Sequence, residues 1–444
     1  MPLRLDTRKS DFSPSFEALL AMKREAAADV DHAVETIIAD VRARGDAALA
    51  DYSLKFDRVA FGAQGPRIAA QDIEAALSQC SADVLAALEL AHKRIVDFHE
   101  RQKPRDEDFT DSLGVELGWR WRPVEAAGLY VPGGTASYPS SVLMNAVPAK
   151  VAGVPRLVMV VPTPDGSLNP LVLAAAHLAG VDEIYRIGGA QAVAALAYGT
   201  QSIAPVAKIV GPGNAYVAAA KRRVFGAVGI DMIAGPSEVL IIADKTANPE
   251  WIAADLLAQA EHDSAAQSIL MTDDPALADE VEAAVARQLA ILPRANIASA
   301  SWQNFGAILL LEKLEDSVAL ADRLAPEHLE IMCTQPDALG DKIRNAGAIF
   351  LGAHTPEAIG DYVGGSNHVL PTARSARFSS GLGVLDFMKR TSILKCTPAS
   401  LESLGPAAVA LGEAEGLSAH ARSVAIRLAR DTAAQAPADT TRPS

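Results

Sequence analysis

The sequence predicts an α/β protein with two mostly parallel sheets, an N-terminal helical arm and a small C-terminal helical domain. From about residue 125, short β-branched runs alternate with alanine-rich segments of helical spacing, a pattern typical of βαβ units. A Gly-Pro break at 234–237 divides these runs into two groups, which favours two sheets over one large sheet. A chain of 444 residues is also too long for one domain with a single hydrophobic core, since domains average ~150 residues.

The individual elements follow in chain order. Residues 15–105 repeat Ala, Leu, Glu and Arg at helical spacing, with a Gly-Pro loop at 61–66, so we expect helices there. Residues 106–123 alternate polar and apolar side chains, which predicts a hairpin, and the pattern beyond residue 380 is again helical. The expected strands are 157–161, 183–187, 207–210, 239–242, 268–271, 307–311, 329–332 and 348–351, and the expected helices between them are 169–180, 190–198, 214–225, 249–262 and 276–291.

The composition restricts the possible classes of function. The net charge is −14, so the chain would repel a phosphate backbone and no nucleic-acid binding is expected. Cys80, Cys333 and Cys396 form no C-x-x-C pair, which argues against a disulfide framework or a thiolate zinc site. No apolar stretch reaches the ~18 residues of a membrane span, and the first residues lack a signal-peptide core. We therefore expect a cytoplasmic protein.

Four of the nine histidines stand in polar clusters, and these clusters are the strongest indication of a functional site. Histidine beside a carboxylate is the chemistry of divalent metals and of proton transfer. We expect folding to bring the clusters together in one site. They are Gln259-Ala-Glu-His262, Pro326-Glu327-His328, Asp361 with Asn367-His368, and Glu415 with His420.

Each cluster also has an ordinary structural explanation. Gln259 and His262 project from one face of the expected helix, but a histidine at a helix end also suits the helix dipole. Glutamine is an unusual zinc ligand. The pair Glu327-His328 fits a strand end with a surface Glu and a half-buried His, and the glycines of 361–368 fit a simple turn. The segment 415–420 fits a solvated helix, and we expect the remaining histidines, His32, His92, His99, His177 and His354, to be structural or surface residues.

Four glycine-rich segments add a second indication. They occupy 128–134, 188–191, 211–214 and 234–237, and the second and third follow expected strands and open expected helices. Backbone N–H groups at such helix starts bind anionic ligands in α/β sheets. No G-x-G-x-x-G fingerprint is present, so the glycines predict a phosphate or nucleotide only weakly, and tight turns explain them equally well.

Taken together and in this order, these segments resemble the histidinol dehydrogenase family over about residues 15–430. The resemblance implies an enzyme that oxidises L-histidinol to L-histidine, the last step of histidine biosynthesis, and passes two hydrides to two NAD molecules. The segments that carry it are Gly128-Leu-Tyr-Val-Pro-Gly-Gly134, Gly211-Pro-Gly-Asn214, Ala234-Gly-Pro-Ser-Glu238, Ala258-Gln-Ala-Glu-His-Asp263, Ala325-Pro-Glu-His-Leu-Glu330, Asn367-His-Val-Leu-Pro-Thr372 and Ala376-Arg-Phe-Ser-Ser380.

The same resemblance implies a role for each site residue. Glu327 and His328 would be the catalytic acid–base pair. One zinc ion per subunit would have protein ligands Gln259, His262, Asp361 and His420, and the substrate's amine and imidazole would complete its nearly octahedral shell, which accounts for the glutamine. The NAD contacts would be Tyr130, Gln191 and Asn214, and the substrate contacts would be Ser237, Gln259, His262, His328, Asp361, His368, Glu415 and His420.

The resemblance also implies a domain plan and an assembly. We expect an N-terminal arm (1–25), a discontinuous α/β domain (26–129 with 237–381), an incomplete Rossmann-like NAD domain (130–236), a C-terminal dimerisation segment (382–434) and a disordered tail (435–444). In the implied homodimer, Glu415 and His420 reach the site of the neighbouring chain.

Three other functions stay open on the sequence. A related zinc- and NAD-dependent dehydrogenase could act on another small alcohol, such as a sulfonated diol. A zinc hydrolase would need an open metal position but none of Tyr130, Gln191 and Asn214. A binding protein without catalysis would not need the intact Glu327-His328 pair. The sequence gives no role for His354 or for the three cysteines.

Overall fold

The computed structural model describes residues 1–22, 29–62, 65–133, 138–233 and 235–429. Gly134, Ala234 and the tail predicted for 435–444 lie outside these residues. The chain divides into two compact units, a larger one of Met1–Lys103 with Pro123–Phe387 and a smaller one of Pro104–Arg122 with Met388–Ser444. None of the described helices combines the length and the apolar character needed to cross a membrane.

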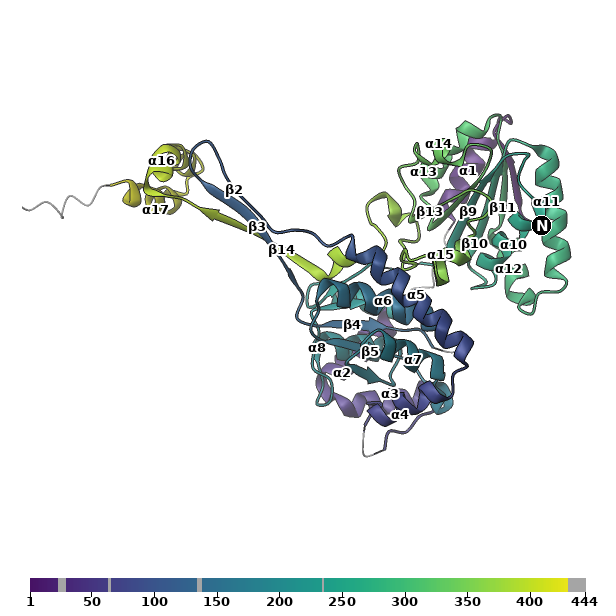
Figure 1. Ribbon diagram of the computed structural model, residues 1–444, viewed down its shortest axis with the longest axis horizontal. Coiled ribbons are helices and arrows are strands. Elements are labelled where there is room, and N and C mark those ends of the chain that lie inside the picture. Colours follow the sequence, from purple (N-terminus) through teal and green to yellow (C-terminus); the bar gives the residue numbers. More distant parts are fainter. Residues whose placement is uncertain (23–28, 63–64, 134–137, 234, 430–444) are drawn as a thin grey trace, which may run out of the picture. The chain divides into compact units, whose positions relative to one another are not determined.

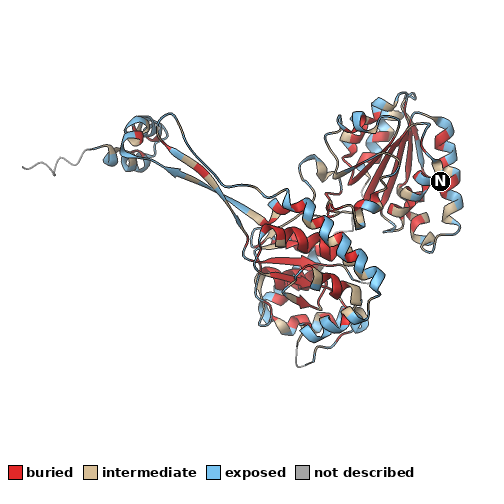
Figure 2. Ribbon diagram, viewed as in Figure 1, coloured by how far each residue is buried: buried red, intermediate tan, exposed pale blue. Residues whose placement is uncertain are grey.

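The larger unit contains a five-stranded parallel sheet in the order β6-β5-β4-β7-β8. The two neighbouring strands β4 and β5 are buried along their whole length (Figure 2), which explains their continuous apolar sequences. The strands are β4 (Ala127–Tyr130), β5 (Leu157–Val160), β6 (Glu183–Tyr185), β7 (Lys208–Val210) and β8 (Gly229–Ile230).

Two groups of helices accompany this sheet (Figure 1). In the first group, Val34 and Val41 of α2 share a buried cluster with Val158 of β5 and Ile209 of β7. The second group consists of α4, α5, α6 and α7, which pack against one another. The helices are α2 (Asp29–Arg44), α3 (Asp46–Asp57), α8 (Gly189–Tyr198) and α9 (Ala215–Val224) in the first group, and α4 (Ala70–Ser78), α5 (Ala82–Glu100), α6 (Pro139–Ala152) and α7 (Pro170–Leu178) in the second.

A six-stranded parallel sheet, ordered β1-β11-β10-β9-β12-β13, also belongs to the larger unit. Successive residues of a strand face opposite sides. Val239 and Ile241 of β9 accordingly pack with α10, α11 and α12, whereas Leu240 and Ile242 pack with α1, α13 and α14. The strands are β1 (Leu3–Asp6), β9 (Glu238–Ala243), β10 (Gln267–Thr272), β11 (Ala307–Leu310), β12 (His328–Met332) and β13 (Ala348–Leu351), and the helices are α1 (Phe12–Ala21), α10 (Pro249–Ala260), α11 (Pro275–Leu289), α12 (Ala295–Phe305), α13 (Ser317–Leu324), α14 (Pro336–Gly340) and α15 (Glu357–Tyr362).

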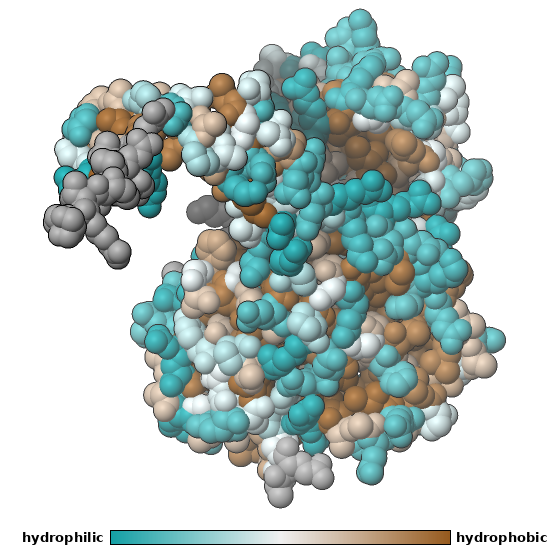
Figure 3. Space-filling view, turned by 60° about the vertical axis from the view of Figure 1, so that its left-hand side comes forward, coloured by the Kyte–Doolittle hydropathy of each residue, from teal (hydrophilic) through white to brown (hydrophobic). Residues whose placement is uncertain are grey.

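The smaller unit combines a three-stranded sheet with a helix pair. Its strands are β2 (Glu107–Thr110), β3 (Glu116–Pro123) and β14 (Met388–Lys395), in the order β14-β3-β2. The helices α16 (Pro398–Ala414) and α17 (Ser418–Leu428) pack closely. Apolar areas remain on the surface of this unit (Figure 3), and the exposed large apolar side chains include Leu394, Leu411, Leu417 and Ile426.

The predicted fold class is confirmed, as are the eight expected strands, to within two residues at each end, and the antiparallel hairpin of β2 and β3. Strands β1, β4 and β8 were not predicted. The expectation of purely helical structure beyond residue 380 was wrong for β14, whose partner strand β3 is distant in sequence.

The predicted domain boundaries need correction. Residues 3–6 are not part of a free arm, because they pair with β11 as an edge strand of the six-stranded sheet. Residues 29–57 were assigned to the domain of the six-stranded sheet, but α2 and α3 bury their apolar faces in the core of the five-stranded sheet. The apolar spacing of a helix identifies its buried face without identifying the sheet that covers it.

Candidate active site

The predicted site residues of the six-stranded sheet lie at the amino ends of its strands. His328 begins β12 and stands beside Val239 of the parallel neighbour β9, so Ser237, just before β9, lies at the same edge. The carboxyl end of α10, which carries Gln259, leads by a short connection into the start of β10. Doubly wound sheets usually bind ligands at the carboxyl ends of their strands. This rule would have predicted a site at the opposite edge of the sheet.

A strained turn brings Glu327 and His328 to this edge. Ala325 caps α13 with a φ of 44°, a left-handed conformation that costs a non-glycine residue ~1–2 kcal/mol. Pro326 disfavours the helical alternative for the residue before it. The helix therefore stops at Leu324, and the chain turns directly into β12. Strain of this kind is concentrated at functional sites.

The backbone of Glu238 contacts the side chains of both Glu327 and His328. Its N–H donates to Oε2 of Glu327 at 2.9 Å, and its carbonyl oxygen lies 3.1 Å from Nδ1 of His328. A carbonyl group only accepts, so Nδ1 carries the hydrogen, and Nε2 is the basic atom of the neutral ring. Nε2 is buried and has no hydrogen-bond partner in the described chain, which leaves it available to a substrate.

Asp361 and His368 meet His328 at the same place. Oδ1 of Asp361, on α15, lies 3.6 Å from Nε2 of His328. The ring of His368 is held through Nδ1, which lies 3.0 Å from the backbone carbonyl oxygen of Asp361. Two segments that are more than thirty residues apart in sequence thus converge around the buried His328, although Asp361 and His368 themselves are only partly buried.

His262 and Gln259 belong to the same neighbourhood. His262 is exposed, but partial desolvation by the surrounding protein lowers its pKa. Asp361 and His328 also influence this pKa, so the three side chains lie within electrostatic range of one another. Gln259 is only 1% exposed, and its Oε1 has no hydrogen-bond partner in the described chain. The structure therefore brings three of the four histidine clusters together.

The predicted helix over 249–262 is slightly too long. Helix α10 ends at Ala260, and His262 lies in the following turn, where its N–H donates to the carbonyl oxygen of Gln259 at 3.2 Å. This turn keeps the two residues near each other, as the expected helix would have done.

The electrostatics of the site suit proton transfer. Burial raises the pKa of Glu327 to about 7. Burial alone would lower the pKa of His328, but the carboxylates of Glu327, Glu357 and Asp361 outweigh it and raise that pKa well above its ordinary value. A carboxyl group that changes protonation near neutral pH can act as a general base.

The donor set fits a divalent cation. In the described residues, no group of three His, Cys, Asp or Glu side chains has the spacing of a complete metal site. The predicted ligands of this unit are only two residues of those types, His262 and Asp361, together with the amide of Gln259. A buried amide oxygen without a partner costs ~1–3 kcal/mol, and a cation would satisfy the Oε1 of Gln259.

A group of buried carboxyls beside His328 was not predicted. Oε2 of Glu357 lies 3.7 Å from Nδ1 of His328, and Oε1 of Glu330 accepts from the Glu357 N–H at 2.6 Å. Burial raises the pKa of Glu357 to about 8 and that of Asp255, whose charge influences Glu330, to about 6. The one available signal was Glu330 itself, a single acid within the apolar strand β12.

The predicted NAD contacts lie at the carboxyl end of the five-stranded sheet. Tyr130 ends β4, and its buried hydroxyl accepts from the N–H of Gly189, at the start of α8, at 2.9 Å. Gln191 lies in the first turn of α8 and is 2% exposed. The side chain of Asn214 caps α9 by accepting from the N–H groups of Tyr216 and Val217. These helix starts offer the positive end of the helix dipole to an anion.

Direct contacts link the two regions within the larger unit. Nε2 of His368 lies 3.3 Å from Oγ of Ser141, in the first turn of α6. The side-chain amide of Asn367 donates to the carbonyl oxygen of Met144 at 2.7 Å. Helix α6 follows β4, the strand that Tyr130 ends. The acid–base residues and the carboxyl end of the five-stranded sheet are therefore connected through α6.

The fourth cluster belongs to the smaller unit. Glu415 caps the end of α16, and His420 lies on α17, so these residues occupy two different helices and not the single short segment expected. Both are exposed.

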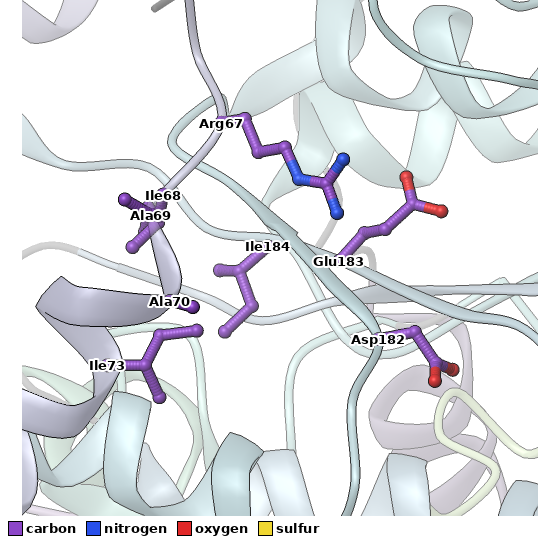
Figure 4. A pocket seen from close by; sticks show the side chains of 8 residues that line it. All are labelled: Arg67, Ile68, Ala69, Ala70, Ile73, Asp182, Glu183 and Ile184. Atoms are coloured by element: carbon purple, nitrogen blue, oxygen red, sulfur yellow. The ribbon is translucent and has the colours of Figure 1, made fainter.

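One surface hollow of the described chain is lined by none of the predicted site residues. It measures about 340 Å³ and is lined by Arg67–Ala70, Ile73 and Asp182–Ile184 (Figure 4). Because Asp182 and Glu183 stand where β6 begins, this hollow lies at the amino end of an edge strand, opposite to the end that carries Tyr130.

Comparison with known proteins gives one consistent result. A family model described as histidinol dehydrogenase matches residues 20–428. The chain is 71% identical to the histidinol dehydrogenase of Rhodopseudomonas palustris and 70% identical to that of Bradyrhizobium diazoefficiens, each over 96% of this chain and 99% of the relative. The crystal structure of histidinol dehydrogenase from Elizabethkingia anophelis superposes with a TM-score of 0.91 at 37% identity, over 96% of this chain and 98% of that one. The chain belongs to the histidinol dehydrogenase family.

Proposed function

We propose that this protein oxidises L-histidinol through L-histidinaldehyde to L-histidine and reduces two NAD molecules in the process. The observation that carries the proposal is the convergence of the partly buried Asp361 with the buried Glu327 and His328, in a chain of this family. A related enzyme for a sulfonated diol is not favoured, because curated relatives 70–71% identical over nearly their full length are histidinol dehydrogenases.

His328 is the base of the alcohol step in this proposal. The hydroxyl proton of histidinol goes to Nε2, while the hydride goes to NAD, the second substrate. The hydrogen bond between Nδ1 and the Glu238 carbonyl fixes the ring so that Nε2 faces the substrate. Neighbouring carboxylates raise the pKa of His328, so Nε2 must lose its proton before the alcohol step. The same carboxylates stabilise the imidazolium that the step forms, in the way that a buried carboxylate supports other catalytic histidines.

Glu327 serves the second step. Its carboxylate takes a proton from water as the hydroxide adds to the aldehyde carbon. The imidazolium of His328 returns its proton to the carbonyl oxygen, which completes the hydrate and leaves His328 neutral again. His328 then accepts a hydroxyl proton from the hydrate as the second hydride goes to a second NAD. The pKa of about 7 for Glu327 suits a base that works near neutral pH.

A zinc ion is part of the proposal. Gln259, His262 and Asp361 would hold it, with His420 as a fourth ligand, and the unpartnered Oε1 of Gln259 supports this set. When bound, the ion would orient the amine and the imidazole of the substrate beside His328. Ser237, His368 and Glu415 would be further substrate contacts.

NAD would bind at the carboxyl end of the five-stranded sheet. Tyr130, Gln191 and Asn214 would contact it, at the two helix starts that open with Gly189 and Asn214. The contact between His368, a proposed substrate contact, and Ser141 of α6 supports a position of the substrate close to the nicotinamide.

A homodimer with shared sites is the proposed assembly, and a cytoplasmic location goes with the biosynthetic role. Glu415 and His420 would enter the site of the partner chain. The exposed apolar side chains of the smaller unit, among them Leu411 at 65% and Leu394 at 66% exposure, support a surface that is covered in the assembly.

Formation of NADH on L-histidinol tests the proposal. We expect an absorbance rise with L-histidinol that a chelator abolishes and added zinc restores. An L-histidinol analogue without the imidazole should react far more slowly at equal concentration. No NADH with zinc-loaded protein, or equal rates with both alcohols, would contradict the proposal and favour a hydrolase or another dehydrogenase.

A further inference from the structure

A buried ion pair in the five-stranded domain is not used by the proposed mechanism. Nζ of Lys221, on α9, and Oδ1 of Asp231, just after β8, form a salt bridge in which the side chains are 2% and 1% exposed. Lys221 is one of the largest fully buried side chains in the described chain. An ion pair this deep requires an explanation, because removing two charges from water costs several kcal/mol per ion.

Both partners of this pair also bind the backbone of one glycine. Nζ of Lys221 donates to the carbonyl oxygen of Gly211 at 2.9 Å, and the Gly211 N–H donates to Oδ2 of Asp231 at 2.8 Å. The other oxygen of Asp231 accepts from the N–H of Met232 at 2.7 Å. The two charges therefore hold the donor and the acceptor of Gly211 at the same time.

Gly211 stands at a critical point of the chain. It follows β7 directly and begins the turn Gly211–Asn214, which leads into α9. Its φ is +111°, and a Cβ there would lie 2.2 Å from the backbone oxygen of Tyr130. The conformation of Gly211 consequently sets the distance between Tyr130 and the helix start capped by Asn214.

Stability alone does not account for the pair. Replacing a buried ion pair by apolar side chains of similar volume is often neutral or stabilising. Buried polar groups that are fully satisfied instead fix one conformation of their surroundings. Here the surroundings are a single turn, at the edge of the sheet where NAD is proposed to bind.

We propose that Lys221 and Asp231 are positioning residues, which lock the Gly211–Asn214 turn in the shape that binds the dinucleotide. The inference rests on the proposed NAD site, and it adds two residues that contact no substrate. If the turn is loosened, Asn214 and the first N–H groups of α9 adopt several positions. NAD binding must then order these groups, which weakens the affinity for NAD.

The test uses a double variant that removes both charges and keeps the volume. Lys221→Met with Asp231→Asn leaves an amide oxygen that can still accept from the Gly211 N–H. NAD affinity is measured by calorimetric titration, the KM for L-histidinol by NADH formation at saturating NAD, and stability by thermal unfolding. We expect the Kd for NAD to rise about tenfold, as for other remote coupling residues, with little change in the KM for L-histidinol.

A second ion pair of the same domain provides the matched control. Arg156 and Glu183 pair at 2.7 Å, at the amino ends of β5 and β6, away from the turn. The double variant Arg156→Met with Glu183→Gln should change thermal stability without changing NAD affinity. Asp231→Glu carries the same test if the first double variant does not fold, because it leaves no buried charge unpaired and displaces the carboxylate from the Gly211 N–H by one methylene group.

The outcomes separate the inference from the proposed function. A folded variant that binds NAD as tightly as the unmodified protein overturns the positioning role. Equal weakening of NAD and L-histidinol binding, in proportion to the lost stability, also overturns it, and so does an equal loss of NAD affinity in the control variant. Failure of the unmodified protein itself to bind NAD would instead contradict the proposed function.

Discussion

Replacing Glu327 by Gln separates the two oxidation steps. The amide keeps the volume of the side chain, and its oxygen can still accept from the Glu238 N–H that Glu327 now binds at 2.9 Å. We therefore expect a change in unfolding free energy below ~1 kcal/mol, as for other substitutions that leave packing and hydrogen bonds in place. The substitution removes the group that accepts a proton from water, and it also removes a negative charge beside His328.

The expected size follows from the electrostatics of the site. With a pKa of about 7, Glu327 is mostly carboxylate at pH 8, and loss of a general base lowers a rate by ~10²–10⁴-fold. This loss applies to the aldehyde step. The alcohol step uses His328, whose Nδ1 lies 3.8 Å from Oε2 of Glu327. Loss of that charge makes His328 less basic, which we expect to change the alcohol step by no more than ~10-fold.

The assay follows each step by itself. L-Histidinaldehyde supplied as substrate reports the second step, and a single turnover on L-histidinol reports the first. Glu357→Gln is the matched control, since it replaces a carboxyl group that lies 3.7 Å from the same Nδ1 atom. Equal losses in both steps for Glu327→Gln, or the same pattern in Glu357→Gln, would refute the separate role of Glu327.

Three further predictions address the site, the assembly and the metal. The kcat/KM for L-histidinaldehyde should rise with pH through about 7, because the carboxylate form of Glu327 is the active base, and a flat profile between pH 6 and 8 would argue against this base. Mixed dimers of His262→Ala and His420→Ala chains should recover part of the activity that each variant lacks, because one of the two sites regains all its ligands, whereas confirmed heterodimers without activity would place the site within one chain. Zinc should raise the thermal unfolding temperature of the metal-free protein, since a ligand that binds only the folded state stabilises it, and Gln259→Ala should reduce this shift; an unchanged shift would remove Gln259 from the ligand set.

The sequence predicted the fold where local pattern is enough. Strands such as β9 and β10 are continuous apolar runs between helices and were predicted. The four residues of β1 include Arg4 and Asp6, and they form a strand only because β11, some three hundred residues later, offers an open edge. In the same way, α2 packs in the core of the five-stranded sheet although the strands of that sheet lie far from it in the sequence, and no local pattern predicts this contact.

The candidate site was predictable in its residues and not in its placement. Histidine with carboxylate marked His262, His328 and His368 from the sequence, but their common location at the amino ends of the six-stranded sheet depends on tertiary structure. Glu357 was missed because it opens a short helix after a proline, where an acid is usually solvated. Its burial arises from β12 and His328, which no local pattern reports.

The number of NADH molecules formed per L-histidinol tests the central claim most directly. A limiting amount of L-histidinol is consumed completely with excess NAD, and NADH and L-histidine are quantified together. The account predicts two NADH and one L-histidine for each L-histidinol, because Glu327 and His328 together complete both oxidations. One NADH with accumulated aldehyde, or no NADH, would contradict it.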